Sequence, residues 1–249
     1  MSKIFSRTFR VRWSELDATR TPDFGQVSPS SYLRYLVETA YDWGDALGLG
    51  ASSEKVRSSP ITRMGHGLFW LIRETEIHLL RPMHHNDVFD FTIWMVNWQR
   101  VRGTRCFEIK LKDSGEIIVQ GTQHIVCMDR QTQRPTNPPE EIINNFKIAV
   151  PRIFPYERFP KISTPVKTFT NQRQVEWQDL DALEHVNNSI YVTYAEEIAL
   201  QELSAYGWNQ ARLSQENLAI NTRRIHIQYL SPALWGETLM ISTHALDIQ

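Results

Sequence analysis

The sequence predicts an α+β fold built from two tandem copies of one unit, in which an antiparallel sheet wraps round a long central helix. Three observations support this prediction. The chain has 249 residues and 41% of them are apolar, so it can bury a core of substantial size. Each half combines one long amphipathic helix pattern with several strand patterns. Three sequence blocks also recur in the same order.

The repeated blocks define the two copies. The offsets between them shrink along the chain, and the first copy carries five extra residues in its turn. Asp, Tyr and Pro stay in step, which chance similarity between short strands would not produce. Two such copies can pair their sheets edge to edge as an intrachain pseudo-dimer. The blocks match 11–18 with 175–182 at an offset of 164, 25–38 with 184–197 at 159, and 77–87 with 227–237 at 150.

Local patterns predict the elements of the first copy in order. Alternation over 9–13 predicts a short strand, and Ser28-Pro29 predicts a helix cap followed by proline at the first helical position. The helix should run from Pro29 to about Leu47 with one apolar face. A polar loop over 51–66 follows. Four strands are then expected, at 68–80, 88–98, 102–112 and 116–128, with a hairpin turn at 113–115.

The predicted boundaries are 1–130 for the first unit, 131–170 for a linker and 171–249 for the second unit. Seven prolines interrupt the linker, which has room for one short helix at 139–146. In the second unit a strand at Val175 leads into a polar turn, and a helix runs to about Gly207. Strands are expected at 222–230 and 238–245. The counterparts of the first copy's last two strands would fall beyond Gln249, so we expect the second unit to lack them.

Composition argues against several classes of protein. The net charge of −1 gives no reason to expect binding to nucleic acid or to an anionic membrane. No apolar run approaches the roughly 20 residues of a membrane span, and no signal peptide is visible. Cys106 and Cys127 cannot form a disulfide framework and fit a reducing compartment, so we expect a cytoplasmic location. The His84-His85 pair has no ligand partners at useful spacing, so we expect neither a metal nor a cofactor.

The polar turn before the second long helix has the residues of an acyl-transfer site. Asp181, His185, Asn187 and Asn188 lie within eight positions of one another. The first backbone N–H groups of a helix and the positive end of its dipole lie at such a turn. A carbonyl oxygen that gains negative charge would be stabilised there, next to an acid or base.

The motif around this turn resembles a known family. The pattern D-L-D-x-x-x-H-V-N-N-x-x-Y, from Asp179 to Tyr191, is similar to that of hotdog-fold thioesterases. The two-copy layout, with Val126-Cys127-Met128-Asp129 and Arg134-Pro135 leading into a proline-rich linker, resembles the tandem-hotdog acyl-ACP thioesterases of the 4-hydroxybenzoyl-CoA thioesterase superfamily. The resemblance implies hydrolysis of a fatty acyl thioester on acyl carrier protein or coenzyme A, in fatty acid biosynthesis and lipid metabolism. It places catalysis in the second hotdog.

The resemblance also implies roles for individual residues. Asp181 falls on the family's catalytic aspartate, as nucleophile or as general base for water, and His185 falls on its histidine. Asn187 aligns with Ser28, so helix capping is its first expected role. A solvated or paired carboxylate is the more ordinary interpretation of Glu197. The full set of expected substrate-binding residues is Asn187, Asn188, Tyr191, Glu197 and Asp17.

The first copy keeps Asp17 but has Gln26 where the second has His185, so we expect it to shape an acyl pocket rather than to catalyse. Its tryptophans could line that pocket, although core packing is the ordinary role of a buried aromatic side chain. They are Trp43, Trp70, Trp94 and Trp98.

The chain departs from the plant-type family pattern at two places. Leu183 stands where those members have asparagine, and Pro232-Ala233 stands where they have Glu-Cys. An acyl-CoA thioesterase arrangement in which Asp181 is the main group therefore fits better. Two alternatives remain open: an acyl-CoA dehydratase or hydratase on the same fold, and a non-catalytic protein that binds acyl chains. The sequence also leaves a homo-oligomer open.

Overall fold

The computed structural model describes residues 4–17, 25–47, 67–146, 154 and 168–244. The chain forms two compact units, which we describe one at a time. Unit 1 comprises residues 1–16, 26–154 and 222–230, and unit 2 comprises 17–25, 155–221 and 231–249. The expected loop at 51–66 lies outside the described residues. The boundaries expected from the sequence stay a prediction.

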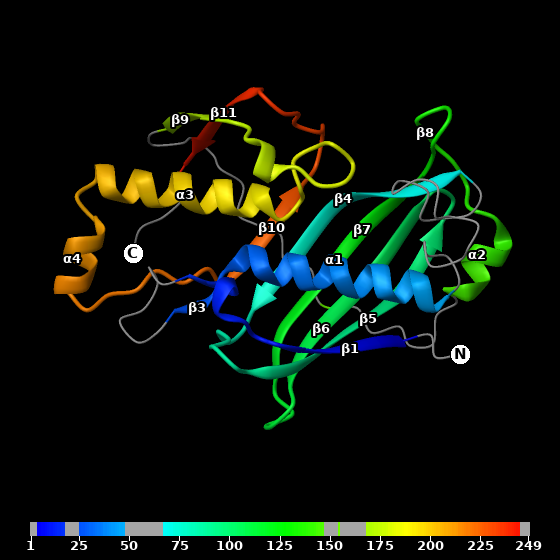
Figure 1. Cartoon of the computed structure of the whole chain (residues 1–249), viewed down its shortest axis with the longest axis horizontal. Coiled ribbons are helices and arrows are strands. Elements are labelled where there is room, and N and C mark those ends of the chain that lie inside the picture. Colours follow the sequence, from blue (N-terminus) through cyan, green and yellow to red (C-terminus); the bar gives the residue numbers. More distant parts are fainter. Residues whose placement is uncertain (1–3, 18–24, 48–66, 147–153, 155–167, 245–249) are drawn as a thin grey trace. The chain divides into compact units, whose positions relative to one another are not determined.

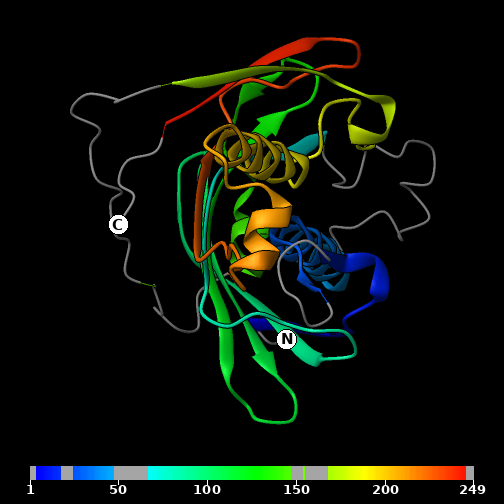
Figure 2. The same ribbon diagram turned by 90° about the vertical axis from the view of Figure 1, so that its left-hand side faces the viewer.

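Unit 1 is a long helix against an antiparallel sheet, as the sequence predicts. The helix α1 (Pro29–Ala46) lies along one face of the sheet, and the strands curve round it (Figures 1 and 2). The strand order is β1-β5-β6-β7-β4-β10, with β8 paired to β7. The strands are β1 (Ile4–Arg10), β4 (Leu68–Leu79), β5 (Val88–Gln99), β6 (Arg102–Leu111), β7 (Ile117–Asp129), β8 (Arg134–Pro135) and β10 (Arg224–Gln228). The short helix α2 (Glu140–Asn145) lies within the predicted linker.

The core of unit 1 lies between α1 and the sheet. The helix begins after Ser28 with Pro29 at its first position, as expected, because proline needs no backbone donor there. Leu33 and Leu36 of α1 are fully buried. Burying an apolar side chain of this size contributes roughly 2 kcal/mol. On the sheet side the fully buried residues include Phe89, Phe91, Ile93, Phe107 and Ile109.

A row of polar side chains crosses this interior, which the sequence did not predict. The Arg105 Nε donates to the Gln123 Oε1 at 2.8 Å, and the Gln123 Nε2 donates to the Thr75 Oγ1 at 2.9 Å. Gln123 and Thr75 are fully buried. Burial lowers the pKa of Arg105 to about 10. The buried Gln123 amide is thus paired at both its oxygen and its nitrogen, which avoids the cost of an unpaired polar group.

The predicted strand at 9–13 is wrong in its bounds. The strand is β1, which ends at Arg10, and the chain then forms a 3₁₀ turn, η1 (Trp13–Glu15). The Glu15 carboxylate accepts the Arg12 N–H at 2.7 Å and stabilises this turn. The same error applies at Val175, which follows β9 (Phe169–Gln174) and precedes η2 (Trp177–Asp179).

The described residues of unit 2 form β9, η2, two helices and β11 (Thr238–Thr243). The helix α3 (Ile190–Ala205) is the predicted long helix, and β9 pairs with β11 in an antiparallel ladder. Its core contains Val175, Val186, Tyr194 and Ala233. A helix that the sequence analysis missed, α4 (Gln210–Gln215), begins where the Asn209 side chain accepts the Arg212 N–H. Among the described residues of unit 2, β9 and β11 form the only named ladder.

Hydrogen bonds confirm the duplication at all three offsets. In both copies the first block bonds to the third, the second block bonds to the third, and a tyrosine hydroxyl of the long helix accepts a backbone N–H of the third block. Equivalent residues of the sequence repeat therefore make equivalent contacts in the structure. The equivalent bonds are Val11 N to Asp87 O and Val175 N to Glu237 O, Val27 N to Met83 O and Val186 N to Ala233 O, and Met83 N to Tyr32 Oη and Ala233 N to Tyr191 Oη.

One strand of the second copy completes the sheet of unit 1. In the antiparallel pair of β10 with β4, His226 lies opposite Glu76. These two residues are also equivalent in the repeat, at the offset of 150, so the pairing of β4 with β10 is symmetric about them. The edge-to-edge pairing expected from the sequence is therefore present at these two strands.

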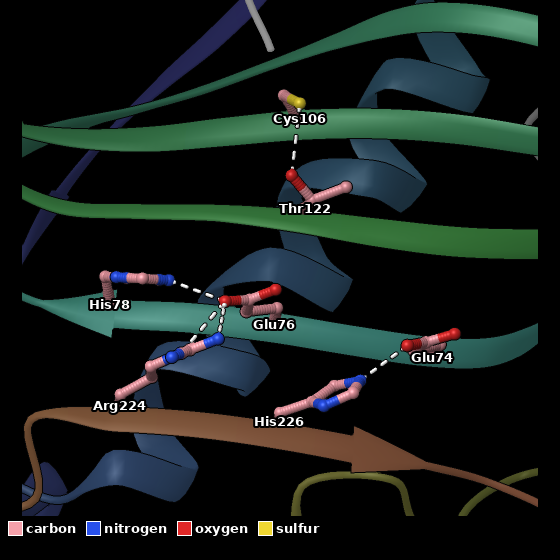
Figure 3. A network of polar contacts seen from close by, with 7 residues as sticks. All are labelled: Glu74, Glu76, His78, Cys106, Thr122, Arg224 and His226. Carbon is pink, nitrogen blue, oxygen red and sulfur yellow. Dashed lines mark hydrogen bonds and ion pairs between the residues drawn. The ribbon is translucent and has the colours of Figure 1, made fainter. Parts of the chain in front are cut away.

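Complementary charges lie at this symmetric pairing, on the face of the sheet away from α1 (Figure 3). The Arg224 Nη2 lies 2.7 Å from the Glu76 Oε1, and the His226 Nε2 lies 2.5 Å from the Glu74 Oε1. The first copy thus supplies carboxylates and the second supplies basic groups. Two identical edges would instead bring like charges together, which is unfavourable.

We expect Arg224→Met to lower the free energy of unfolding by about 2 kcal/mol, because the buried Glu76 carboxylate then loses the guanidinium and keeps the His78 Nε2, at 2.7 Å, as a basic partner. The Glu76 side chain is 6% exposed. Urea denaturation measures the effect. Arg81→Met is the control, since Arg81 and Glu116 form an ion pair with 52% and 46% exposed side chains and should lose less than about 1 kcal/mol. Equal losses in the two variants would contradict the prediction.

Candidate active site

The Asp181 turn is held by its own hydrogen bonds. The Asp181 N–H donates to the His185 carbonyl oxygen at 3.0 Å, and Leu180 pairs with Val186. The Asp181 Oδ1 accepts the Leu183 N–H at 2.8 Å, which is the Asx turn that an aspartate commonly forms. Glu184 has a positive φ of 63°, a conformation that costs a non-glycine residue about 1 kcal/mol or more. The turn is therefore a defined structure that holds a strained residue.

Asp181, His185 and Asn187 converge, as the sequence predicts. The His185 Nδ1 lies 3.6 Å from the Asp181 Oδ1, and the Asn187 Nδ2 makes a long hydrogen bond of 3.5 Å to the Asp181 Oδ2. The side chains of Asp181 and His185 are 25% and 26% exposed. The carboxylate is thus oriented by neighbours on both sides and still reaches solvent, which a general base that activates water requires.

The start of the helix differs in detail from the prediction. The helix α3 begins at Ile190, two residues later than the alignment with α1 suggests. The N-cap residue is Ser189 rather than Asn187, and its side chain makes no capping hydrogen bond. Asn187 lies two residues earlier and holds the start of the helix, because its Oδ1 accepts the Ser189 N–H at 2.9 Å and its carbonyl oxygen accepts the Ile190 N–H. The Asn187 N–H itself donates to the Asp179 carbonyl oxygen at 2.8 Å. That amide is therefore not available to a substrate carbonyl, whereas Asn188 lies half-buried just before the helix.

The other expected substrate-binding residues are spread over the fold. The Tyr191 hydroxyl accepts the Ala233 N–H at 3.1 Å, and burial raises its pKa. Glu197 forms an ion pair of 2.6 Å with Arg173, which matches the ordinary interpretation of this carboxylate. Asp17 ends β2 (Leu16–Asp17), which pairs with β3 (Gln26–Val27). No substrate-facing role is visible for Glu197.

Sequence reasoning missed two features beside the turn. Asp179 is 4% exposed and is bonded to Tyr194 of α3, although it lies in the quoted motif. Trp177 and Trp235 form an exposed edge-to-face pair, with ring centroids 5.4 Å apart and exposures of 71% and 64%. The repeat alignment could have found Asp179, since it matches Glu15 at the offset of 164. The tryptophan pair joins two distant blocks, so no local pattern reveals it.

Comparison with known families agrees with this geometry. A family profile described as the thioesterase-like superfamily matches residues 11–146 and 175–249. The chain belongs to this superfamily. The match omits 147–174, so it falls on both copies and leaves out most of the predicted linker. The hotdog fold expected from the motif is confirmed by this match together with the solved structures that resemble the chain.

The relatives of this superfamily member include plant acyl-ACP thioesterases. A chloroplastic palmitoyl-acyl carrier protein thioesterase of Cuphea hookeriana is 26% identical over 197 residues, which is 76% of this chain and 45% of the relative. The chain thus spans about half the length of the curated relatives it matches.

Solved structures show the same fold. A protein assigned as an oleoyl thioesterase of Lactobacillus plantarum has a TM-score of 0.73 and 22% identity, covering 95% of this chain and 82% of that chain. The 12:0-ACP thioesterase of Umbellularia californica has a TM-score of 0.70 and 19% identity, covering 96% of this chain and 86% of that chain. In the part of the chain that the structure describes, no helix has the length and apolar character needed to cross a membrane.

The two departures from the plant-type pattern have structural explanations. Leu183 is half-buried, and its N–H donates to the Asp181 carboxylate, so this residue contributes to the turn through its backbone and not its side chain. Ala233 is 5% exposed and bonds through both its N–H and its carbonyl oxygen. Its small side chain lies in the unit 2 core with Val186 and Tyr194. Neither position offers a polar side chain to a substrate.

We expect Asn187→Ala to lower the free energy of unfolding by about 1 kcal/mol, because the start of α3 loses the oxygen that accepts the Ser189 N–H. Asn187→Ser is the matched variant and should lower the free energy of unfolding by only about 0.3 kcal/mol, since serine caps helices about as well as asparagine. Chemical denaturation measures both. An alanine variant as stable as the wild type would show that this amide does not hold the helix start.

Proposed function

We propose that this protein hydrolyses fatty acyl thioesters and releases the free fatty acid and a thiol. The observation that carries the proposal is the Asp181 carboxylate, part-exposed and oriented by His185 and Asn187. Membership of the thioesterase-like superfamily supports the reaction class. The names of the relatives support a fatty acyl substrate.

In the proposed reaction, Asp181 acts as general base and takes a proton from water. The water oxygen attacks the thioester carbonyl, the C–S bond breaks, and the proton returns to the leaving thiolate. The Asp181 Oδ1 already accepts the Leu183 N–H and lies beside His185, so this oxygen is occupied by contacts within the protein. Taking a proton from water requires less of such a carboxylate than direct nucleophilic attack on the thioester carbonyl does. His185 orients the carboxylate or the water.

The substrate carrier is proposed as acyl carrier protein or coenzyme A. The names of the plant relatives favour acyl carrier protein. The departures at Leu183 and Ala233 favour a simpler arrangement in which Asp181 is the main group. Trp43 supports core packing more than a pocket lining, because it is 2% exposed and its ring lies 5.0 Å from that of Phe146. The cytoplasmic location stays a prediction.

Asp181→Asn tests the proposal. The amide cannot accept a proton from water, so kcat for thiol release should fall by a factor of 100 or more. A thiol-reactive dye measures release from a medium-chain or long-chain acyl thioester. Asp129→Asn is the control, because Asp129 is another turn aspartate that accepts a backbone N–H, from Thr132 at 2.7 Å. Unchanged activity in Asp181→Asn would instead support an acyl-binding protein without catalysis.

A panel of acyl-CoA and acyl-ACP substrates of varied chain length tests the carrier. If acyl carrier protein is the partner, kcat/KM should be at least tenfold higher for the acyl-ACP of the same chain, through contacts outside the acyl group. Enoyl-CoA added to the same panel separates hydrolysis from hydration. Consumption of enoyl-CoA without thiol release would indicate a hydratase and contradict the proposal.

A further inference from the structure

Both copies contain a carboxylate that is bonded to a tyrosine of the long helix; Asp179 in unit 2 is buried, whereas Glu15 in unit 1 is half-buried. In unit 2 the Tyr194 hydroxyl donates to the Asp179 Oδ2 at 2.6 Å, and both residues are less than 5% exposed. In unit 1 the Tyr35 hydroxyl donates to the Glu15 Oε2, and Tyr35 is 3% exposed. The two pairs are equivalent in the repeat. The mechanism above uses neither.

The frame around each carboxylate is also the same. The Glu176 N–H donates to Asp179 at 2.8 Å, and the Arg12 N–H donates to Glu15 at 2.7 Å. The carbonyl oxygen of each acidic residue accepts the N–H of a residue just before the long helix. These bonds are Asn187 N to Asp179 O at 2.8 Å and Ser28 N to Glu15 O at 2.9 Å.

In unit 2 this frame connects directly to the Asp181 carboxylate. Asp179 lies two residues before Asp181, and its carbonyl oxygen fixes Asn187, whose Nδ2 reaches the Asp181 Oδ2. The Asp179 side chain meanwhile ties the same strand of the turn to α3 through Tyr194. Movement of Asp179 would therefore displace both Asp181 and the amide that orients it. In unit 1 the equivalent frame leads to Gln26 in place of His185.

Unit 2 further reinforces its frame with a charge. The Arg173 guanidinium lies 4.4 Å from the centre of the Tyr194 ring and 3.9 Å from the Asp179 carboxylate. The residue equivalent to Arg173 in unit 1 is Phe9, whose ring lies 5.0 Å from that of Tyr35. Burial and the hydrogen bond to Asp179 raise the pKa of Tyr194 to about 12, so its hydroxyl stays protonated and donates at neutral pH.

We propose that Asp179 and Tyr194 are positioning residues, which hold Asp181 and Asn187 in reacting geometry without touching the substrate. The inference rests on the proposed thioester hydrolysis. The Asp179 carboxylate is buried and already accepts the Glu176 N–H and the Tyr194 hydroxyl, so it has no access to substrate and its effect must pass through the backbone. Small displacements of a catalytic group lower kcat steeply. The equivalent pair in unit 1 supports the fold alone.

The test compares Tyr194→Phe with Tyr35→Phe, since each removes the hydroxyl of a buried tyrosine that donates to the equivalent carboxylate. Thiol release from an acyl thioester gives kcat and KM, and urea denaturation gives the unfolding midpoint. Both variants should lower the midpoint, Tyr35→Phe by less, because water can reach the half-buried Glu15 carboxylate but not the buried Asp179 carboxylate. Tyr194→Phe should lower kcat roughly tenfold with KM within about twofold, whereas Tyr35→Phe should leave kcat within about twofold. Asp179→Asn and Glu15→Gln form a second matched pair with the same expectation.

Several outcomes would overturn the inference. An unchanged kcat in Tyr194→Phe would show that the pair is structural only, and so would equal losses of kcat in Tyr194→Phe and Tyr35→Phe. If both unit 2 variants fail to fold while the unit 1 variants fold, the pair is a folding element. Asp181→Asn separates this inference from the proposed function: a wild type without thiol release, or an Asp181→Asn variant with full activity, refutes the function first.

Discussion

The site depends on a short hydrogen-bonded ladder between the two strands of one turn. Residues 179–181 bond to residues 185–187 through the Asn187 and Asp181 amides. This ladder brings a carboxylate, an imidazole and an amide together within eight residues of chain. A turn of this kind would be mobile in an isolated peptide, because few contacts offset the entropy of ordering it. Here the buried Asp179 carboxylate ties one strand of the ladder to α3, and the Val186 N–H ties the other to Ala233.

The repeat shows which parts of this arrangement serve the fold. Both copies keep the tyrosine–carboxylate pair and the backbone hydrogen bond to the residue just before the long helix. Both also keep a second tyrosine whose hydroxyl accepts a backbone N–H. These contacts satisfy buried polar groups, and losing any of them would leave such a group unpaired. The copies differ in the groups placed on the frame. The second has His185 and Arg173, whereas the first has Gln26 and Phe9 at the equivalent positions.

The pairing of β4 with β10 illustrates the same divergence at another place. Duplication makes the two edges equivalent, and the register brings Glu76 opposite its own counterpart, His226. Identical edges would oppose like charges, whereas here the Arg224 cation of the second copy lies against the Glu76 carboxylate of the first. Arg224 and His226 lie against Glu76 and Glu74 (Figure 3). Electrostatic complementarity therefore distinguishes this pairing from a pairing of two identical edges.

The sequence by itself determined the α+β class, the duplication, the helix at Pro29 and the strands from Leu68 to Asp129, because these follow from hydrophobic period and local caps. It also determined that Asp181, His185 and Asn187 lie together, since a short turn leaves them no room to separate. The tertiary structure decided what surrounds them: the later start of α3, the use of the Asn187 amide, and the Tyr194 and Arg173 contacts to Asp179. Those contacts join residues from separate elements, and their geometry is set by packing, which no local pattern encodes.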